Sequence, residues 1–335
     1  MAMTMTALLA VAVLTAPSGA AAGAEARASC APATNIEAIV DDSGSMGGSD
    51  YYRLRVQGLD LLINTLPAKT YLGAVEFGSG SFFEESKPAA DTVFPPEPVG
   101  PNAAAMRSAL DAAINADNGA TDYNAAFAKA DADNPTAQAR IFLTDGGHNE
   151  GEYTEAHLAH NVPTYVIGFS PGLASPEDQA RLQKIATDTG GQIFQLEDNS
   201  ELQAVMNKIG AALTCQTPPQ EFTDLLRLGQ VKTHSVAIGG STRSLQIALS
   251  WASPLDRFKL LHLRLIARHR VIAKARPKVR KLRVKRSGGH TFALVKVSGL
   301  RKGKLRFSVK AVKVGSGEPR VKLTTQVGRG SKRKH

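Results

Sequence analysis

A carboxylate and two hydroxyls occupy alternate positions directly after a mostly apolar run near residue 40. The run 36–40 ends at Asp41, and Ser43 and Ser45 follow it. Gly44 lets the backbone bend sharply between the two serines. Oxygen-only ligands on a turn suit a hard divalent cation, Mg²⁺ in preference to Zn²⁺. The same residues also fit an ordinary Asp/Ser turn that caps the next helix.

Two distant stretches offer further oxygen atoms. Thr121 lies at the start of a helical pattern that Asp122 is expected to cap. Asp145 follows the buried strand predicted at 140–144 and precedes a Gly-Gly turn. Ligands bind outside the carboxyl ends of the strands in open α/β sheets, where the strand order switches. Asp41 and Asp145 end the first and fourth predicted strands, which flank that switch.

This set resembles the metal-ion-dependent adhesion site of the von Willebrand factor A domain, whose pattern is D-x-S-x-S, then a Thr, then an Asp. All five positions match in order: Asp41, Ser43, Ser45, Thr121 and Asp145. One departure is Gly-Ala before the threonine, where the family usually has Gly-Gly. The resemblance implies a bound Mg²⁺ (or Mn²⁺) with one open coordination position, which a carboxylate of a partner protein fills.

The resemblance runs over 30–215, where predicted strands alternate with predicted helices. Strands are expected at 36–40, 71–77, 91–94, 140–144, 163–169 and 192–196. Helices are expected at 54–66, 103–114, 122–132, 176–188 and 199–209. This alternation predicts the α/β class, with a doubly wound, mostly parallel sheet. The strand at 91–94 is an antiparallel edge strand in the resembling family, and a proline-rich loop is expected at 95–98.

The pattern changes after the predicted linker 216–222, which contains Pro218 and Pro219. Apolar and polar residues then alternate with a period of two, as in the stretches 245–251, 261–265 and 305–311. Strands with one solvated face predict a smaller antiparallel β-sandwich at 223–327. Its spacing resembles bacterial pre-peptidase C-terminal modules. Residues 328–335 are expected to form a basic disordered tail.

The net charge of +10 conceals two oppositely charged halves. Residues 1–215 carry a charge of −15, and residues 216–335 carry +25. The stretch 264–286 is especially basic, which predicts attachment to an anionic envelope polymer or a lipid surface. A merely solvated strand face is the alternative interpretation. Because few aromatic residues are interleaved, base stacking has no support, and no nucleic-acid partner is expected.

The N-terminal residues 1–28 read as a secretory signal peptide. Their apolar core, 7–16, is too short to span a bilayer, and small residues follow it. No later stretch is long and apolar enough for a transmembrane helix, so the mature chain is expected to be secreted or associated with the cell envelope.

The two cysteines, Cys30 and Cys215, bracket the A-like region. An even pair in an exported chain suggests a disulfide, and some extracellular A domains close their ends in this way. Two unpaired buried thiols are the alternative.

These features favour a non-enzymatic binding protein. The chain has no G-x-S-x-G elbow, no H-E-x-x-H motif and no phosphate loop. His148 and Glu150 either line the metal rim or are solvated loop residues. One rival is a secreted hydrolase whose A-like domain recruits substrate, and another is an intracellular subunit of a metal-chelatase or ATPase assembly. The scarcity of acids in the second half argues against the first rival, and the export signal argues against the second.

Overall fold

The computed structural model describes residues 30–78, 88–115, 119–169, 175–197, 199–216, 219–268, 270–274, 282–315, 317 and 320–329. The predicted signal peptide, most of the predicted tail and part of the basic stretch 264–286 lie outside these residues. None of the described helices has the length and apolar character needed to cross a bilayer.

A six-stranded sheet with the order β3-β2-β1-β4-β5-β6 forms the first half of the chain. Its strands are β1 (Asn35–Asp41), β2 (Tyr71–Phe77), β3 (Ala90–Pro98), β4 (Ala139–Thr144), β5 (Thr164–Phe169) and β6 (Gln192–Leu196). All neighbouring pairs are parallel except β2 and β3. The predicted mostly parallel α/β fold is therefore confirmed.

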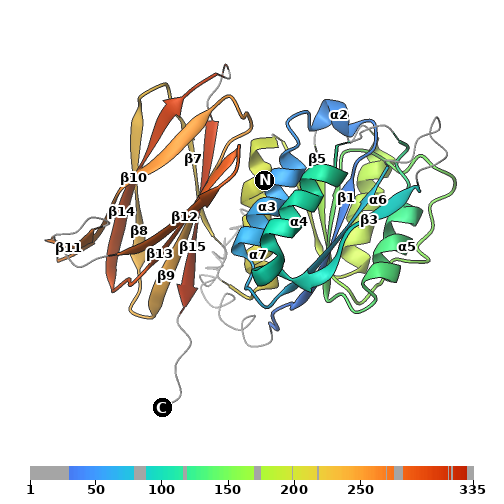
Figure 1. Cartoon of the computed structure of the whole chain (residues 1–335), viewed down its shortest axis with the longest axis horizontal. Helices are drawn as coiled ribbons and strands as arrows, with labels where there is room; N and C mark the ends of the chain where they lie inside the picture. Colours follow the sequence, from blue (N-terminus) through green and yellow to red (C-terminus); the bar gives the residue numbers. More distant parts are fainter. Residues whose placement is uncertain are drawn as a thin grey trace, which may run out of the picture. The chain divides into compact units, whose positions relative to one another are not determined.

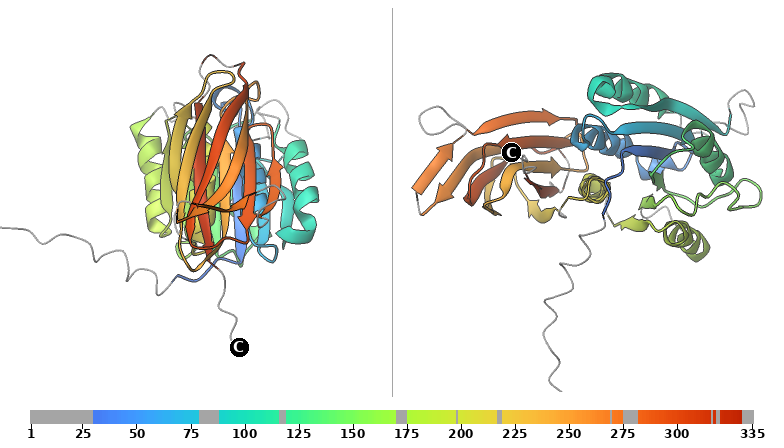
Figure 2. Two further views of the ribbon diagram at one scale, coloured as in Figure 1. Left: turned by 90° about the vertical axis from the view of Figure 1, so that its left-hand side faces the viewer. Right: turned by 90° about the horizontal axis from the view of Figure 1, so that it is seen from below.

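Helices cover both faces of this sheet (Figures 1 and 2). They are α2 (Met46–Ser49), α3 (Leu54–Thr65), α4 (Val99–Ala113), α5 (Tyr123–Asp133), α6 (Pro176–Asp188) and α7 (Leu202–Leu213), with a short 3₁₀ helix, η1 (Asn199–Glu201). One core contains side chains of α3, α4 and α7, and the other contains side chains of α5 and α6. Successive β1 residues enter different cores, since Ala38 and Val40 face α3 and α7 while Ile39 faces α5.

Two local expectations are corrected. The predicted loop at 95–98 is the second half of β3. Proline cannot donate to a sheet ladder, but an edge strand needs donors on one side only, so it tolerates proline. The last helix, expected from residue 199, begins at Leu202, and Asn199 instead begins η1. Asp122 does cap α5, because its carboxylate accepts from the Ala125 amide at 3.1 Å.

The second half of the chain contains two antiparallel sheets, with the orders β11-β10-β14-β8 and β12-β13-β9-β15-β7. Their strands are β7 (Gln220–Leu225), β8 (Val231–Ile238), β9 (Thr242–Ser250), β10 (Arg257–Ala267), β11 (Arg270–Lys274), β12 (Arg283–Gly288), β13 (Phe292–Ser298), β14 (Gly303–Lys313) and β15 (Arg320–Arg329). The inward side chains of both sheets form one apolar core. β7 begins inside the predicted linker, and β15 extends two residues into the predicted tail.

The α/β region and the β region share a small set of contacts. Leu61 of α3 belongs to one buried cluster with Phe292 and Leu294 of β13. Asn207 of α7 donates a hydrogen bond to the Thr324 hydroxyl of β15 at 2.8 Å.

The cysteines are disulfide-bonded, and because the chain contains only two, the bond joins Cys30 to Cys215. The predicted disulfide is confirmed. Cys215 follows Thr214, the C-cap of α7, and has a positive φ of 52°. Its amide donates to the Ala212 carbonyl at 3.1 Å, and the Gln216 amide donates to the Ala211 carbonyl at 2.8 Å. This pair of bonds is a Schellman cap, in which glycine usually occupies the left-handed position.

Candidate metal-binding site

The candidate site lies at the carboxyl ends of β1 and β4. The two strands are parallel, and the last pair in their register is Val40 opposite Leu143. The next residue along each strand is therefore Asp41 on β1 and Thr144 on β4, and Asp145 follows Thr144. An isolated bridge between Ser43 and Gly119 brings in the loop before α5. Strand pairing therefore joins three stretches that are far apart in sequence.

Asp41 is fully buried, and both of its carboxylate oxygens accept hydrogen bonds. The Ser43 amide donates to Oδ1 at 2.9 Å, and the Thr144 hydroxyl donates to Oδ2 at 2.6 Å. Burial raises the Asp41 pKa to about 6, and the nearby Asp145 carboxylate acts in the same direction. Thr144, which sequence reasoning missed as a site residue, thus fixes the orientation of this acid.

Two hydroxyls and a carboxylate meet beside Asp41. Ser43 Oγ lies 3.2 Å from Ser45 Oγ, and Ser45 Oγ donates to Asp145 Oδ1 at 2.7 Å. Asp145 Oδ2 is buried and has no hydrogen-bond partner among the described residues. A buried carboxylate oxygen without a donor is unfavourable. A cation at this position would remove that cost.

Thr121 is buried, and its backbone is held by a loop that sequence reasoning missed. Its amide donates to Asn149 Oδ1 at 2.7 Å, and its carbonyl accepts from the Asn149 amide at 3.0 Å. A Cβ atom placed on Gly146 would lie 3.7 Å from Thr121 Oγ1 and 3.6 Å from Ser45 Oγ. The threonine hydroxyl therefore faces the same point as Ser45, and all five candidate residues gather at one place.

The donor set suits a hard divalent ion. It offers carboxylate and hydroxyl oxygens and no nitrogen or sulfur, which is the set that Mg²⁺ and Mn²⁺ accept. Within the described ranges, no three His, Cys, Asp or Glu side chains cluster in a way that would hold a metal. The site contains two acids, Asp41 and Asp145. The serine and threonine hydroxyls would therefore supply the remaining protein ligands.

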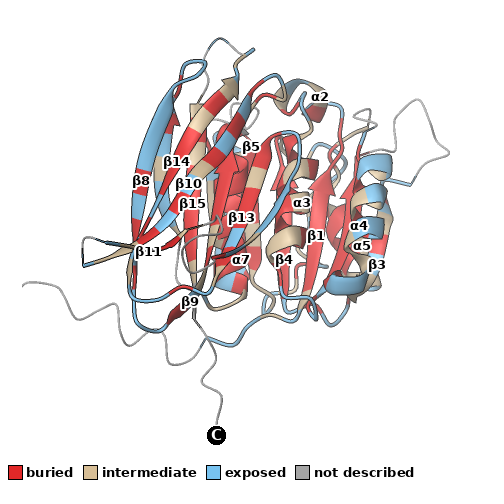
Figure 3. Ribbon diagram, turned by 60° about the vertical axis from the view of Figure 1, so that its left-hand side comes forward, coloured by how far each residue is buried: buried red, intermediate tan, exposed pale blue. Residues whose placement is uncertain are grey.

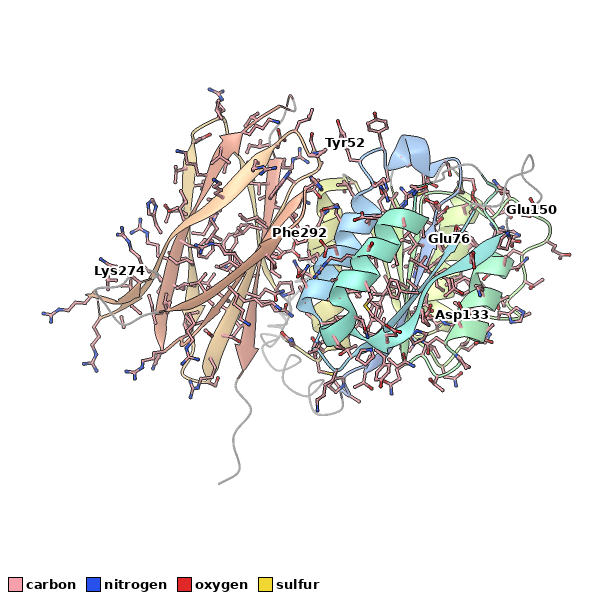
Figure 4. The ribbon with its side chains drawn as sticks, viewed as in Figure 1. Tyr52, Glu76, Asp133, Glu150, Lys274 and Phe292 are labelled. Carbon is pink, nitrogen blue, oxygen red and sulfur yellow. The ribbon has the colours of Figure 1, made fainter. Side chains whose placement is uncertain are left out.

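His148 and Glu150 have different surroundings. The His148 side chain is buried, and its Nδ1 accepts a hydrogen bond from the Tyr123 amide at 3.1 Å. Burial lowers the His148 pKa, so the imidazole is neutral at pH 7. Glu150 is exposed on the same loop (Figure 4). His148 thus helps to hold the start of α5.

A buried ionic network includes Asp42, which directly precedes the turn that carries Ser43 and Ser45 (the serine turn). The Arg55 guanidinium on α3 donates to Asp42 Oδ1 at 2.6 Å and to Asp50 Oδ2 at 3.2 Å, and all three side chains are fully buried. Asp42 Oδ2 also accepts from the Asn115 amide, just beyond α4, at 3.1 Å. Asp42 occupies the variable position of D-x-S-x-S, so the motif itself gives no signal for this network.

Residues 35–208 match the family model of the von Willebrand factor type A domain. The chain belongs to the von Willebrand factor type A family. No curated protein matches it. In this type A chain, the matched segment contains the six-stranded sheet and all five candidate ligands, while the antiparallel sheets lie beyond it.

Solved structures similar to this chain include the three that follow. A von Willebrand factor type A protein from Catenulispora acidiphila is 17% identical, with a TM-score of 0.43, and the match covers 90% of this chain and 66% of that one. Proximal thread matrix protein 1 from the mussel byssus, with a zinc-occupied MIDAS motif, is 18% identical with a TM-score of 0.43. The match covers 60% of this chain and 51% of that one. The pilus adhesin SpaC from Lactobacillus rhamnosus GG is 12% identical with a TM-score of 0.42. The match covers 89% of this chain and 44% of that one. The type A chain thus spans between 44% and 66% of the length of these three structures.

Proposed function

We propose that this chain is an exported, non-enzymatic binding protein that captures a partner protein through a divalent metal ion. Asp41, Ser43, Ser45, Thr121 and Asp145 would hold Mg²⁺ or Mn²⁺, directly or through water. The observation that carries the proposal is the unpartnered, buried oxygen Asp145 Oδ2 beside converging serine hydroxyls.

The charge balance of the site explains what such an ion would attract. Two carboxylates, those of Asp41 and Asp145, only neutralise a divalent cation, and the serine and threonine hydroxyls add no charge. The ion would therefore remain electrophilic towards a third carboxylate from outside. A partner protein that presents an exposed Asp or Glu supplies that group.

The β region supports a binding role over a catalytic one. Asp224 and His234, joined at 2.6 Å, form its nearest approach to a catalytic pair. Both side chains are buried, and the His234 ring packs against Phe222 and Phe307. The pair therefore joins the two sheets from inside the core, where a substrate has no access.

The disulfide and the charge distribution support an extracytoplasmic location. A disulfide persists in oxidising compartments and is rare in the cytosol, which argues against an intracellular chelatase or ATPase subunit. The basic β region would attach the chain to an anionic envelope surface.

Calorimetric titration of Mg²⁺ and Mn²⁺ into the disulfide-bonded protein tests the metal site. Asp145→Asn keeps the side-chain shape and removes one charge, so we expect at least a tenfold loss of affinity. Glu150→Gln is the matched control, because it removes an exposed charge from the same loop, and it should change affinity less than threefold. Equal affinity in wild type and Asp145→Asn would end the metal proposal.

The partner is sought by affinity capture from an envelope extract, once with Mg²⁺ and once with a chelator. A protein retained by wild type only with metal, and lost with Asp145→Asn, supports the adhesion role. Retention that survives both chelation and Asp145→Asn would place the partner's binding surface elsewhere on the chain.

A further inference from the structure

The outer face of the sheet β11-β10-β14-β8 carries a row of cations across neighbouring strands. Lys274 of β11 pairs with Arg264 of β10, and Arg264 pairs with Arg306 of β14. Arg264 and Arg306 are exposed, and Lys274 is half-buried on the edge strand (Figure 4). Neighbouring strands lie about 4.8 Å apart, so the row places three positive charges at short, regular intervals.

A second pair of cations lies along the same face. Lys259 of β10 is directly opposite Lys310 of β14. Between this pair and the three-cation row, Ser308 of β14 is opposite Thr233 of β8, and their hydroxyl oxygens are 3.0 Å apart. Figure 3 shows exposed and buried positions alternating along these strands, as expected for a sheet with one solvated face. Hydrogen-bonding hydroxyls are thus framed by positive charge on both sides.

These five cations have no counter-charge in the described part of the chain. No ion pair there includes Lys259, Arg264, Lys274, Arg306 or Lys310. The three acids of the described β region have other partners. Asp224 contacts His234, and Glu221 pairs with Lys208 of α7. Asp256 is buried and accepts from the Gly315 amide at 2.8 Å. Like charges placed directly opposite on neighbouring strands are destabilising. An external anion would relieve this repulsion.

We propose that this face, which we call the cation face, binds a linear polymer of phosphodiester groups. The inference rests on the envelope attachment proposed above and names the surface and the chemistry responsible for it. A guanidinium fork donates to two phosphate oxygens at once. The two non-bridging oxygens of a phosphodiester sit on a tetrahedral centre, so they can also accept from a lysine or hydroxyl that lies out of the plane of the fork. The lone pairs of a carboxylate lie in a single plane.

The composition of the cation face favours this polymer over a membrane or a nucleic acid. Val231 is the only large apolar side chain on this sheet that is strongly exposed, among the residues described. Surface-bound membrane proteins insert apolar side chains into the headgroup region, and this face offers too few. Among the described residues, no Phe, Tyr or Trp side chain on the sheet is exposed, and His262 of β10 is the one exposed ring. Successive bases would therefore find no row of rings to stack on.

The test measures binding of the full disulfide-bonded chain to poly(glycerol phosphate). The cation-face triple variant is K274Q/R264Q/R306Q. The matched control, R283Q/K285Q/R286Q, removes the same charge from exposed positions on β12 of the other sheet. We expect the cation-face triple to weaken binding at least tenfold and the control less than threefold. The melting temperature of the cation-face triple variant should not fall below that of wild type, because the three substitutions remove repulsion between neighbouring cations.

The remaining outcomes distinguish a failure of this inference from a failure of the envelope attachment on which it rests. An equal loss in both triples would show that net charge governs attachment, which overturns the cation face but leaves attachment standing. Equal or tighter wild-type binding to anionic vesicles, to polygalacturonate or to a single-stranded oligonucleotide would overturn the phosphodiester assignment. If wild type binds none of these probes at low salt, the proposed attachment itself fails.

Discussion

Glu37, the third residue of β1, is a fully buried acid that stays protonated near neutral pH. Burial raises its pKa to about 8, although the Asn134 amide donates to Oε2 at 2.9 Å and so favours the ionised form. The folded chain therefore binds a proton that the unfolded chain releases near pH 4.5. Stability must fall as pH rises through this window, because the native state holds more protons than the unfolded state.

Glu37→Gln should abolish that part of the pH dependence. Asp41 and Asp50 also have pKa values raised to about 6, so the comparison belongs between pH 6.5 and 8.5, where Glu37 is the main contributor of the three. We expect wild type to lose on the order of 2 kcal/mol over this range, since one pKa unit corresponds to about 1.4 kcal/mol. Urea unfolding at both pH values measures it, with exposed Glu152→Gln as control. Parallel losses in wild type and Glu37→Gln would contradict the assignment.

That the five candidate residues bind a metal stays a prediction, but the residues themselves could be selected from the sequence because they form an ordered pattern of side-chain types. Thr144 and Asn149 could not. Asn149 acts on the backbone of Thr121, 28 residues away, and many polar residues could fill that role. Thr144 becomes a partner of Asp41 only through the pairing of β1 with β4.

Arg55 links three elements: α3, the serine turn and the end of α4. Replacing Arg55 leaves the Asp42 and Asp50 carboxylates buried without this cation. Burial already disfavours the charged form of Asp50, as its raised pKa shows. Removing one partner of a buried ion pair costs about 3–5 kcal/mol. We therefore expect Arg55→Met to lower the unfolding free energy by that amount in urea titrations at pH 7.

The matched control is Lys129→Met, which removes a half-buried cation paired with Asp133 at 3.0 Å on α5. Partly solvated pairs of this kind contribute less than about 1 kcal/mol. A comparable loss in both variants would show that the Arg55 network has no special role. Adding Asp42→Asn to Arg55→Met should recover part of the stability, because it removes one of the two stranded charges.

Strand and helix order could be predicted at the element scale, because apolar periodicity determines it. β3 was predicted too short because its prolines argue against a strand in general. Only its position at the sheet edge, a property of the assembled sheet, makes Pro95, Pro96 and Pro98 acceptable. The Arg55 network was missed for a related reason, since a buried arginine and a surface arginine look alike in sequence.

At the scale of the whole molecule, the disulfide encloses 186 residues, counting both cysteines. Chain-entropy arithmetic assigns about 5 kcal/mol to a loop this long, as an upper figure. The double variant Cys30→Ser/Cys215→Ser should therefore unfold at lower urea concentration than the oxidised protein. Reduced wild type should match the double variant. Coincident unfolding curves for the oxidised and reduced chains would show that the bond contributes nothing to stability.

The position of that bond also determines how the chain carries mechanical load. Tension applied between Cys30 and the β region passes through the two sulfur atoms at the ends of the type A domain. The enclosed sheet lies outside this path, so pulling on the chain does not peel β1 away from its neighbours. A load applied at the candidate metal site follows a different route, through the folded sheet to Cys215. The protein would then respond to a pull on its ligand and remain insensitive to a pull on its own chain.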